Sequence, residues 1–291
     1  MTYMYYSRIY RQSSGFTNQI FSFVTSIIIA IYDRKPALIF DHFLDDYSKE
    51  DYTIISNIID LEQMNIFLFQ RYGLLVIDGH NIDSRIVPEN IINEIIKCEI
   101  YIYTHTFGWI NDINKDLFEN ILLNIRFHRD FVEKADSFIQ KIGDKKTNVI
   151  HLRLEDDAII HWSKMNEMSE IEFKQYIEDK YIKLIETYID KSDETIILSS
   201  SSKNGVIDFF EREGYSYKFT DKHFEGREKN AIVDLLISKC CNNIFIGNFN
   251  PVKLNGSSFS YYISKSLQND VKQIMIDLDK IRDVEIIQFV K

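Results

Sequence analysis

One short segment combines two residues that could handle a phosphorylated ligand. His151 and Arg153 stand two positions apart at the end of the apolar segment Asn-Val-Ile-His-Leu-Arg-Leu, so in a strand they would share one face. An arginine guanidinium is a rigid fork of donors that suits a diphosphate, and ligands of open α/β sheets bind at the carboxyl ends of strands. The alternative is an Arg153–carboxylate pair beside a hydrogen-bonded His151. Because a basic residue in an apolar strand is costly without a partner, we favour the ligand role.

Two other segments place small and hydroxyl residues where a helix is expected to begin. Gly15 precedes the first helix and would let the backbone approach a ligand, while the free N–H groups of the helix start attract an anion. A plain turn with Thr17 or Asn18 as the N-cap is the simpler interpretation there. The run Ser257-Ser-Phe-Ser260 follows a strand and could bind phosphate in the same way. Its alternative is an ordinary serine N-cap.

Two more segments carry polar groups in unusual places. Asp234 lies inside the apolar stretch 231–237, and its carboxylate could accept two N–H donors from a guanine edge. The alternative is an exposed aspartate. The segment from Ser199 to Gly205 follows another expected strand, and its hydroxyls and helix N–H groups could hold a sugar or a phosphate. A polar loop with an N-cap is at least as good an explanation.

The composition excludes several classes of protein. The chain has 291 residues, of which 45% are hydrophobic, and only 10 Gly and 3 Pro, so it can form a full core and is neither collagen-like nor a low-complexity linker. A formal net charge of −10 argues against general binding to nucleic acid. The 3 Cys, two of them adjacent, fit neither a disulfide framework nor a zinc site. The apolar run 20–32 is too short to span a membrane, so we expect a cytoplasmic protein without a membrane segment.

Strand-like and helix-like segments alternate along the chain. Helix 169–189 has a capping box, Ser169 with Glu172, and Gly214 ends another helix. Strands are expected at 3–10, 36–40, 74–77, 99–103, 148–154, 195–198, 243–246 and 273–276, and helices at 18–33, 115–142 (long or broken), 169–189, 204–213, 228–240 and 257–267.

This alternation predicts an α/β protein with parallel sheets. From about residue 144 the series is a regular βαβαβα, whereas the first half is less regular around 44–51 and 78–89. Two Rossmann-like domains facing a central cleft fit both the length and the pattern. We therefore expect an N-terminal domain over 1–143 and a C-terminal domain over 144–291.

Taken together and in order, these motifs resemble those of the GDP-fucose-dependent fucosyltransferases of the O-fucosyltransferase superfamily, which also covers α1,2- and α1,6-fucosyltransferases. The most specific match is His-x-Arg, and Gly-x-x-Asn-Gln is second. The matched order and spacing run from residue 3 to about 267, whereas 44–145 matches no part of the pattern. The matching segments are Gly15-Phe-Thr-Asn-Gln19, His151-Leu-Arg-Leu-Glu155, and Asp234 followed by Gly256-Ser-Ser-Phe-Ser260.

The resemblance implies a GT-B type fold with an acceptor-side first domain and a nucleotide-sugar-binding second domain. It implies an inverting glycosyltransferase that moves L-fucose from GDP-fucose to a hydroxyl of a glycan or protein acceptor, with no metal ion and no other cofactor. By carry-over, Arg153 would neutralise the departing GDP, and His151 and Asp234 would recognise the guanine side. Phosphate and adjacent groups would be held by Ser257, Ser258 and Phe259, and the diphosphate and fucose would be covered by Gly15, Phe16, Thr17 and Asn18.

The implied chemistry needs charge stabilisation and a base. Cleavage builds positive charge on the anomeric carbon and negative charge on the diphosphate, which an arginine and helix N-termini can stabilise. Glu155 or Asp156 could accept the proton of the acceptor hydroxyl, and Asn18 could instead orient the acceptor.

Some features depart from the family pattern. The serines 199–202 stand where many relatives carry an acidic turn, which puts a sugar contact there in doubt. The chain also lacks the disulfides and anchors of secretory members, so we expect a cytoplasmic glycan, a lipid-linked sugar or a cytosolic protein as acceptor. Two alternatives stay open, namely transfer from another nucleotide-deoxysugar, such as one of rhamnose, and a non-catalytic nucleotide- or glycan-binding relative.

Overall fold

The computed structural model describes residues 5–7, 15–40, 42–46, 51–81, 115–199, 203–251, 255–281 and 286–289. The chain forms two compact units, the first comprising Met1–Lys134 and His223–Val233 and the second Ala135–Lys222 and Asp234–Lys291. Two helices, α6 (Arg129–Ile142) and α10 (Arg227–Ser238), run from one unit into the other. The expected domain boundary after residue 143 stays a prediction.

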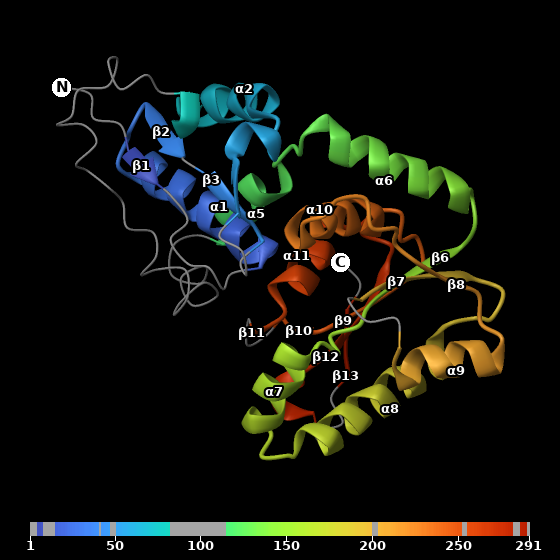
Figure 1. Ribbon diagram of the computed structural model, residues 1–291. Coiled ribbons are helices and arrows are strands. Elements are labelled where there is room, and N and C mark those ends of the chain that lie inside the picture. Colours follow the sequence, from blue (N-terminus) through green and yellow to red (C-terminus); the bar gives the residue numbers. More distant parts are fainter. Residues whose placement is uncertain are drawn as a thin grey trace. The chain divides into compact units, whose positions relative to one another are not determined.

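A small parallel sheet with the strand order β1-β2-β5 organises the first unit (Figure 1). Helix α1 is apolar around most of its surface, and aromatic rings pack on it from both sides. The Phe21 ring lies 5.2 Å from that of Phe118, and the Phe23 ring lies 4.9 Å from that of Phe40. The elements are β1 (Tyr5–Ser7), α1 (Phe16–Tyr32), β2 (Ala37–Phe40), the antiparallel pair β3 (His42–Asp46) and β4 (Asp51–Ile54), α2 (Leu61–Tyr72), β5 (Leu75–Asp78) and α5 (Lys115–Leu123).

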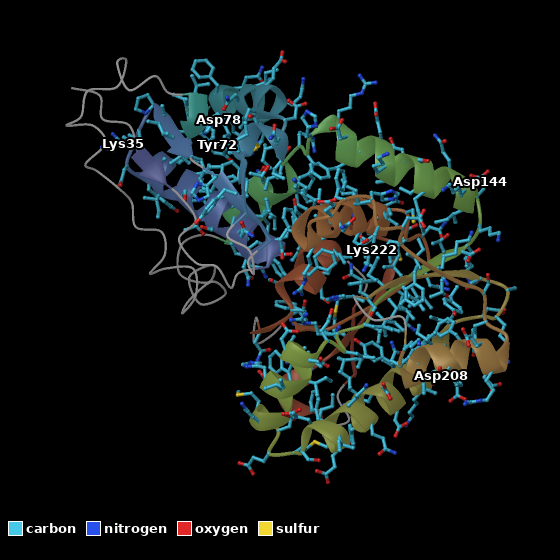
Figure 2. The ribbon with its side chains drawn as sticks, viewed as in Figure 1. Lys35, Tyr72, Asp78, Asp144, Asp208 and Lys222 are labelled. Carbon is cyan, nitrogen blue, oxygen red and sulfur yellow. The ribbon has the colours of Figure 1, made fainter. Side chains whose placement is uncertain are left out.

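One buried carboxylate stands at the end of a strand in this unit. Asp78 closes β5 and is labelled in Figure 2. It accepts a hydrogen bond from Ser56 Oγ at 2.5 Å and another from the main-chain N–H of His80 at 3.0 Å. These bonds satisfy the carboxylate within the protein, so we assign it a structural role.

The second unit is built on a six-stranded sheet with the order β13-β12-β9-β6-β7-β8. All neighbours are parallel except β12 and β13. Helices α8 and α9 lie on one face and α11 lies on the other (Figure 1). The elements are β6 (Thr147–His151), α7 (Asp156–Met165), α8 (Glu170–Tyr188), β7 (Glu194–Leu198), α9 (Gly205–Glu213), β8 (Tyr217–Phe219), β9 (Ile244–Gly247), β10 (Phe249–Asn250), β11 (Asn255–Gly256), α11 (Ser258–Ser266), β12 (Lys272–Ile276) and β13 (Ile286–Phe289).

The strand order creates a point where the chain reverses direction across the sheet. From β6 the chain adds β7 and β8 on one side, and it then returns to add β9 and β12 on the other. In doubly wound sheets a crevice opens at the carboxyl ends of the two strands that flank such a reversal. Here those strands are β6 and β9, which pair at Val149–Phe245 and Ile150–Ile246.

Several sequence expectations are corrected by the structure. The strand expected over 148–154 ends at His151, so Arg153 lies beyond the strand. The segment 44–51, expected to be irregular, contains parts of the paired strands β3 and β4. Helices α2 and α7 and strands β8 and β13 were not expected. Of the two forms expected for the helix over 115–142, long or broken, the structure shows the broken one, as α5 and α6. The strand expected at 99–103 lies outside the described residues.

Candidate functional site

The carboxyl ends of β6 and β9 are joined by a buried polar network. Asn248 follows β9 and donates from its side-chain amide to the carbonyl oxygen of His151 at 2.8 Å. The hydroxyl oxygen of Tyr181, from α8, lies 2.8 Å from the same carbonyl oxygen and 2.7 Å from Asn248 Oδ1. It also accepts the main-chain N–H of Arg153 at 3.2 Å. The network therefore fixes the backbone on both sides of Leu152, at the reversal point of the sheet.

His151 is enclosed and neutral. Its side chain is 6% exposed, its ring stacks edge-on to Phe259 at 5.1 Å, and its Nδ1 lies 2.7 Å from Ser260 Oγ. Burial, and secondarily the charge of Arg153, lower the pKa of His151 to about 3. An imidazole with that pKa carries no charge at neutral pH, so His151 acts through hydrogen bonding.

Arg153 is held by two carboxylates of the following helix. Its Nη1 donates to Glu155 Oε2 at 3.0 Å, and its Nη2 lies 3.4 Å from Asp157 Oδ2. The carboxylate pair that the sequence left open as an alternative is therefore present. Arginine has five N–H donors, and its side chain keeps 24% of its surface exposed, so the ion pairs orient the guanidinium and leave further N–H groups for a ligand.

The turn into α11 depends on one glycine. Gly256 has a φ of +108°, and a Cβ there would lie 2.6 Å from the carbonyl oxygen of Asn248, so no other residue fits this close approach. Ser257 is the N-cap of α11 and accepts the N–H of Ser260 at 3.3 Å. The serine N-cap alternative is thus confirmed for Ser257. Ser258 and Phe259 lie in the first turn, and both are half-buried.

Asp234 is half-buried in α10, not exposed as the alternative interpretation had it. Burial raises the pKa of Asp234 to about 6, and a hydrogen bond with the Thr220 side chain partly opposes that rise. Among the described residues, no hydrogen bond joins it to His151 or Arg153. A carboxylate that is partly desolvated and accepts one hydrogen bond retains acceptor capacity for N–H donors.

The start of α1, in the first unit, carries the other expected ligand residues. Gly15 is the N-cap, so the proposed N-cap roles of Thr17 and Asn18 are wrong. Glycine has no side chain that could cap the helix, and the carboxylate of Glu228 accepts the main-chain N–H of Phe16 instead. Phe16, Thr17 and Glu228 are buried, and Asn18 is half-buried. A protein carboxylate thus stands at the helix end where we expected a diphosphate.

Glu228 was missed in the sequence, as were Tyr181, Asn248 and Ser260 as members of the site network. The first turn of a helix attracts acidic residues, but nothing in the sequence indicates that Glu228 would cap a helix more than two hundred residues away. The polar position of Ser260 next to the expected phosphate-binding serines was the one local signal.

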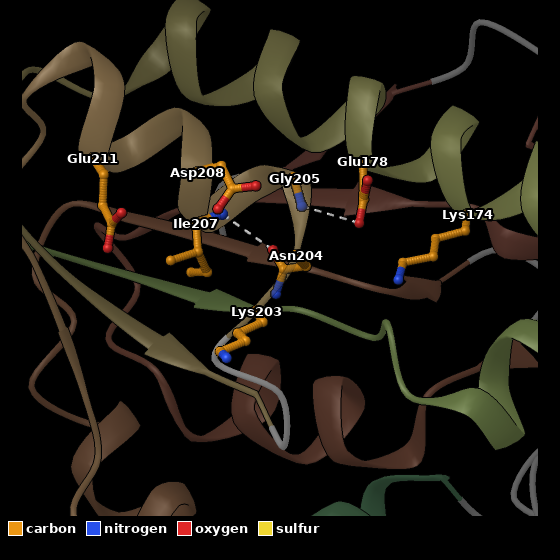
Figure 3. A pocket seen from close by; sticks show the side chains of 8 residues that line it. All are labelled: Lys174, Glu178, Lys203, Asn204, Gly205, Ile207, Asp208 and Glu211. Atoms are coloured by element: carbon orange, nitrogen blue, oxygen red, sulfur yellow. Dashed lines mark hydrogen bonds between the residues drawn. The ribbon is translucent and has the colours of Figure 1, made fainter.

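A polar pocket of about 760 Å³ lies between α8 and α9, beside the end of β7 (Figure 3). The start of α9 lies at this pocket, but Glu178 Oε1 accepts the N–H of Gly205 at 3.2 Å and Asn204 Oδ1 accepts those of Val206 and Ile207. The N-cap alternative for the serine-rich segment is therefore confirmed, with Asn204 as the cap. Serines 200–202 lie outside the described residues.

Two features are absent from the described part of the chain. In it, no group of three or more His, Cys, Asp or Glu side chains could hold a metal ion. None of its helices has both the length and the apolar character needed to cross a membrane.

The fold and the strand-end residues define a doubly wound α/β protein whose central strands β6 and β9 end in a buried polar network. No protein-family model and no curated protein matches the sequence. Among solved structures, fucosyltransferase NodZ from Bradyrhizobium has the same fold, with a TM-score of 0.63, 13% identity, and coverage of 100% of this chain and 99% of that chain. POFUT1 in complex with GDP-fucose follows at a TM-score of 0.55 and 12% identity, covering 91% of this chain and 94% of that chain.

At such identities the likeness is one of fold. The expected α/β class of GT-B type is confirmed, and the resemblance to fucosyltransferases that the motifs indicated extends to the fold of the whole chain.

Proposed function

We propose that this chain is an inverting glycosyltransferase that transfers L-fucose from GDP-fucose to a hydroxyl of a glycan or protein acceptor without a metal ion. The observation that carries the proposal is the position of His151 at the end of the central strand and of Arg153 just beyond it, at the reversal point of a fold shared with fucosyltransferase structures soaked with GDP-fucose or in complex with it. The cysteine-poor composition supports a cytoplasmic acceptor.

Arg153 would stabilise the leaving group. As the sugar–phosphate bond breaks, negative charge grows on the diphosphate, and a guanidinium already oriented by Glu155 and Asp157 needs little reorganisation to meet it. The N-terminus of α11, with Ser257, Ser258 and Phe259, would supply further donors. Gly15, Phe16, Thr17 and Asn18 would contribute from the first unit.

His151 and Asp234 would recognise the guanine base of the donor. A neutral imidazole and a carboxylate with remaining acceptor capacity suit the hydrogen-bonding edges of guanine better than they suit a phosphate.

The base that deprotonates the acceptor would be Glu155. Its Oε2 is engaged by Arg153, so Oε1 would take the proton from the attacking hydroxyl. Asn18 would orient the acceptor.

The test begins with a panel of GDP-, UDP- and dTDP-linked sugars, including GDP-fucose and a nucleotide-rhamnose. Release of nucleoside diphosphate only from GDP-fucose is the expected result, and release from a rhamnose donor would favour that alternative. Thermal stabilisation by GDP should be lost in Arg153→Ala and kept in Arg212→Ala, an exposed arginine on α9. Equal stabilisation of both variants would contradict the donor site, and binding without any release would favour a non-catalytic relative.

A further inference from the structure

The hydroxyl of Ser260 has a defined proton direction. Its oxygen accepts the main-chain N–H of Asn248 at 2.9 Å and lies 2.7 Å from His151 Nδ1. The serine is fully buried. Among the described residues, His151 Nδ1 is the one acceptor within reach of its proton. If His151 instead carried its proton on Nδ1, the Ser260 proton would be buried without an acceptor, which is disfavoured.

The other ring nitrogen of His151 is then the protonated one, because a neutral imidazole has one donor and one acceptor nitrogen. Nε2 makes no hydrogen bond within the described part of the chain, and it is not among the fully enclosed polar atoms that lack a partner there. It therefore keeps some access to solvent. The strand-end network holds the main chain of His151, and the contact with Ser260 holds Nδ1, so both the backbone and the ring of His151 are fixed.

We propose that Ser260 is a positioning residue that fixes His151 as the neutral tautomer with its proton on Nε2, and that this N–H donates to an acceptor atom of the guanine base. The second half of this inference rests on the proposed function, since guanine is the nucleotide base of GDP-fucose. The chemistry favours the base over the diphosphate, because a neutral N–H gains less from a phosphate oxygen than the charged Arg153 beside it. The inference also excludes His151 as the catalytic base, since its acceptor nitrogen faces Ser260.

The first experiment is independent of any ligand. In protein labelled with ¹⁵N-histidine, the ring nitrogens of His151 are assigned by comparison with His151→Phe. We expect an acceptor-type shift for Nδ1 and a protonated-type shift for Nε2, unchanged between pH 5 and pH 8. In Ser260→Ala the two tautomers should exchange, while Ser264→Ala, a buried serine one turn further along α11, should keep the wild-type pattern. A wild-type ring protonated on Nδ1 would overturn the proposal whatever the protein binds.

The second experiment concerns the ligand. Ser260→Ala should weaken binding of GDP roughly three- to tenfold, the range for loss of one neutral hydrogen bond, with little change for inorganic pyrophosphate. Ser260→Thr keeps the hydroxyl and should bind GDP as the wild type does. An equal loss for GDP and pyrophosphate would overturn the contact with guanine. No GDP binding by the wild type would refute the proposed function and leave the tautomer result standing.

Discussion

The side-chain amide of Asn248 donates a hydrogen bond of 2.8 Å to the carbonyl oxygen of His151 and so ties the end of β9 to the end of β6. These two strands flank the point at which the chain reverses across the sheet. Parallel strands that meet at a reversal tend to splay at their carboxyl ends, which opens a crevice for a ligand. The bond sets how far these ends can separate.

Asn248→Ala should therefore destabilise the second unit. The side chain is fully buried and its amide also faces Tyr181, so its loss removes hydrogen bonds that water cannot replace. We expect the free energy of unfolding to fall by about 1–3 kcal/mol, measured by urea denaturation. Thr187→Ala removes an exposed hydroxyl bonded to Lys183 and should have almost no effect. A similar loss of stability in both variants would mean that the strand-end bond contributes no more to the free energy of unfolding than an exposed hydrogen bond does.

Tyr181→Phe should act on the same network from α8. The phenol oxygen accepts the N–H of Arg153, and the phenylalanine would leave that partly enclosed N–H without its partner. We expect a loss of about 1–2 kcal/mol of stability and weaker thermal stabilisation by GDP. Tyr176→Phe on the same helix, where the ring is 37% exposed, serves as the control. If thermal stabilisation by GDP is unchanged in Tyr181→Phe, the network does not control the placement of Arg153.

Glu228→Gln tests whether the start of α1 receives a diphosphate. The amide oxygen of glutamine can still accept the N–H of Phe16, but the negative charge that now stands at this helix end is removed. If the diphosphate binds there, GDP affinity should rise severalfold, as measured by calorimetry. Glu225→Gln makes the same charge change at an exposed position three residues before Glu228. Equal affinities in the two variants would argue that Gly15 and its neighbours do not meet the diphosphate.

Asp234 should make stability depend on pH. Its pKa is raised to about 6 from the ordinary aspartate value of 3.8, so the unfolded chain loses this proton first and stability falls as the pH rises from about 4 to 6. The full shift corresponds to roughly 3 kcal/mol, and partial solvation reduces our expectation to about 1–2 kcal/mol. Asp234→Asn should match the wild type at pH 4 and exceed it at pH 7.5 in urea unfolding. Asp208→Asn, at an exposed position, should show no such difference.

Local signals in the sequence located several regular elements of the second unit but missed α7, β8 and β13. The Ser169–Glu172 capping box and the left-handed Gly214 are present as expected. The same kind of signal marked α2, where Asp60 caps the start and Gly73 ends the helix, but the weakly patterned face between them hid it.

Only part of the candidate site could be predicted from the sequence. His151 and Arg153 could be found because charged and polar residues at the end of an apolar run are unusual. Their partners could not be found, because Tyr181 and Asn248 come from a helix and a strand end that only the strand order brings together. A tyrosine in a helix or an asparagine after a strand has no local feature that distinguishes it from its neighbours.

The strand order also has a consequence for folding during synthesis. On one side β6 pairs with β7, which follows it in the chain after two helices. On the other side Ile150 pairs with Ile246, which is synthesised much later. Closing that longer loop costs more chain entropy and slows folding. During synthesis β6, β7 and β8 can assemble with α8 while β9 is still inside the ribosome. We therefore expect the seam between His151 and Asn248 to close only after β6, β7 and β8 have assembled, so that the nascent chain acquires its strand-end network late in folding.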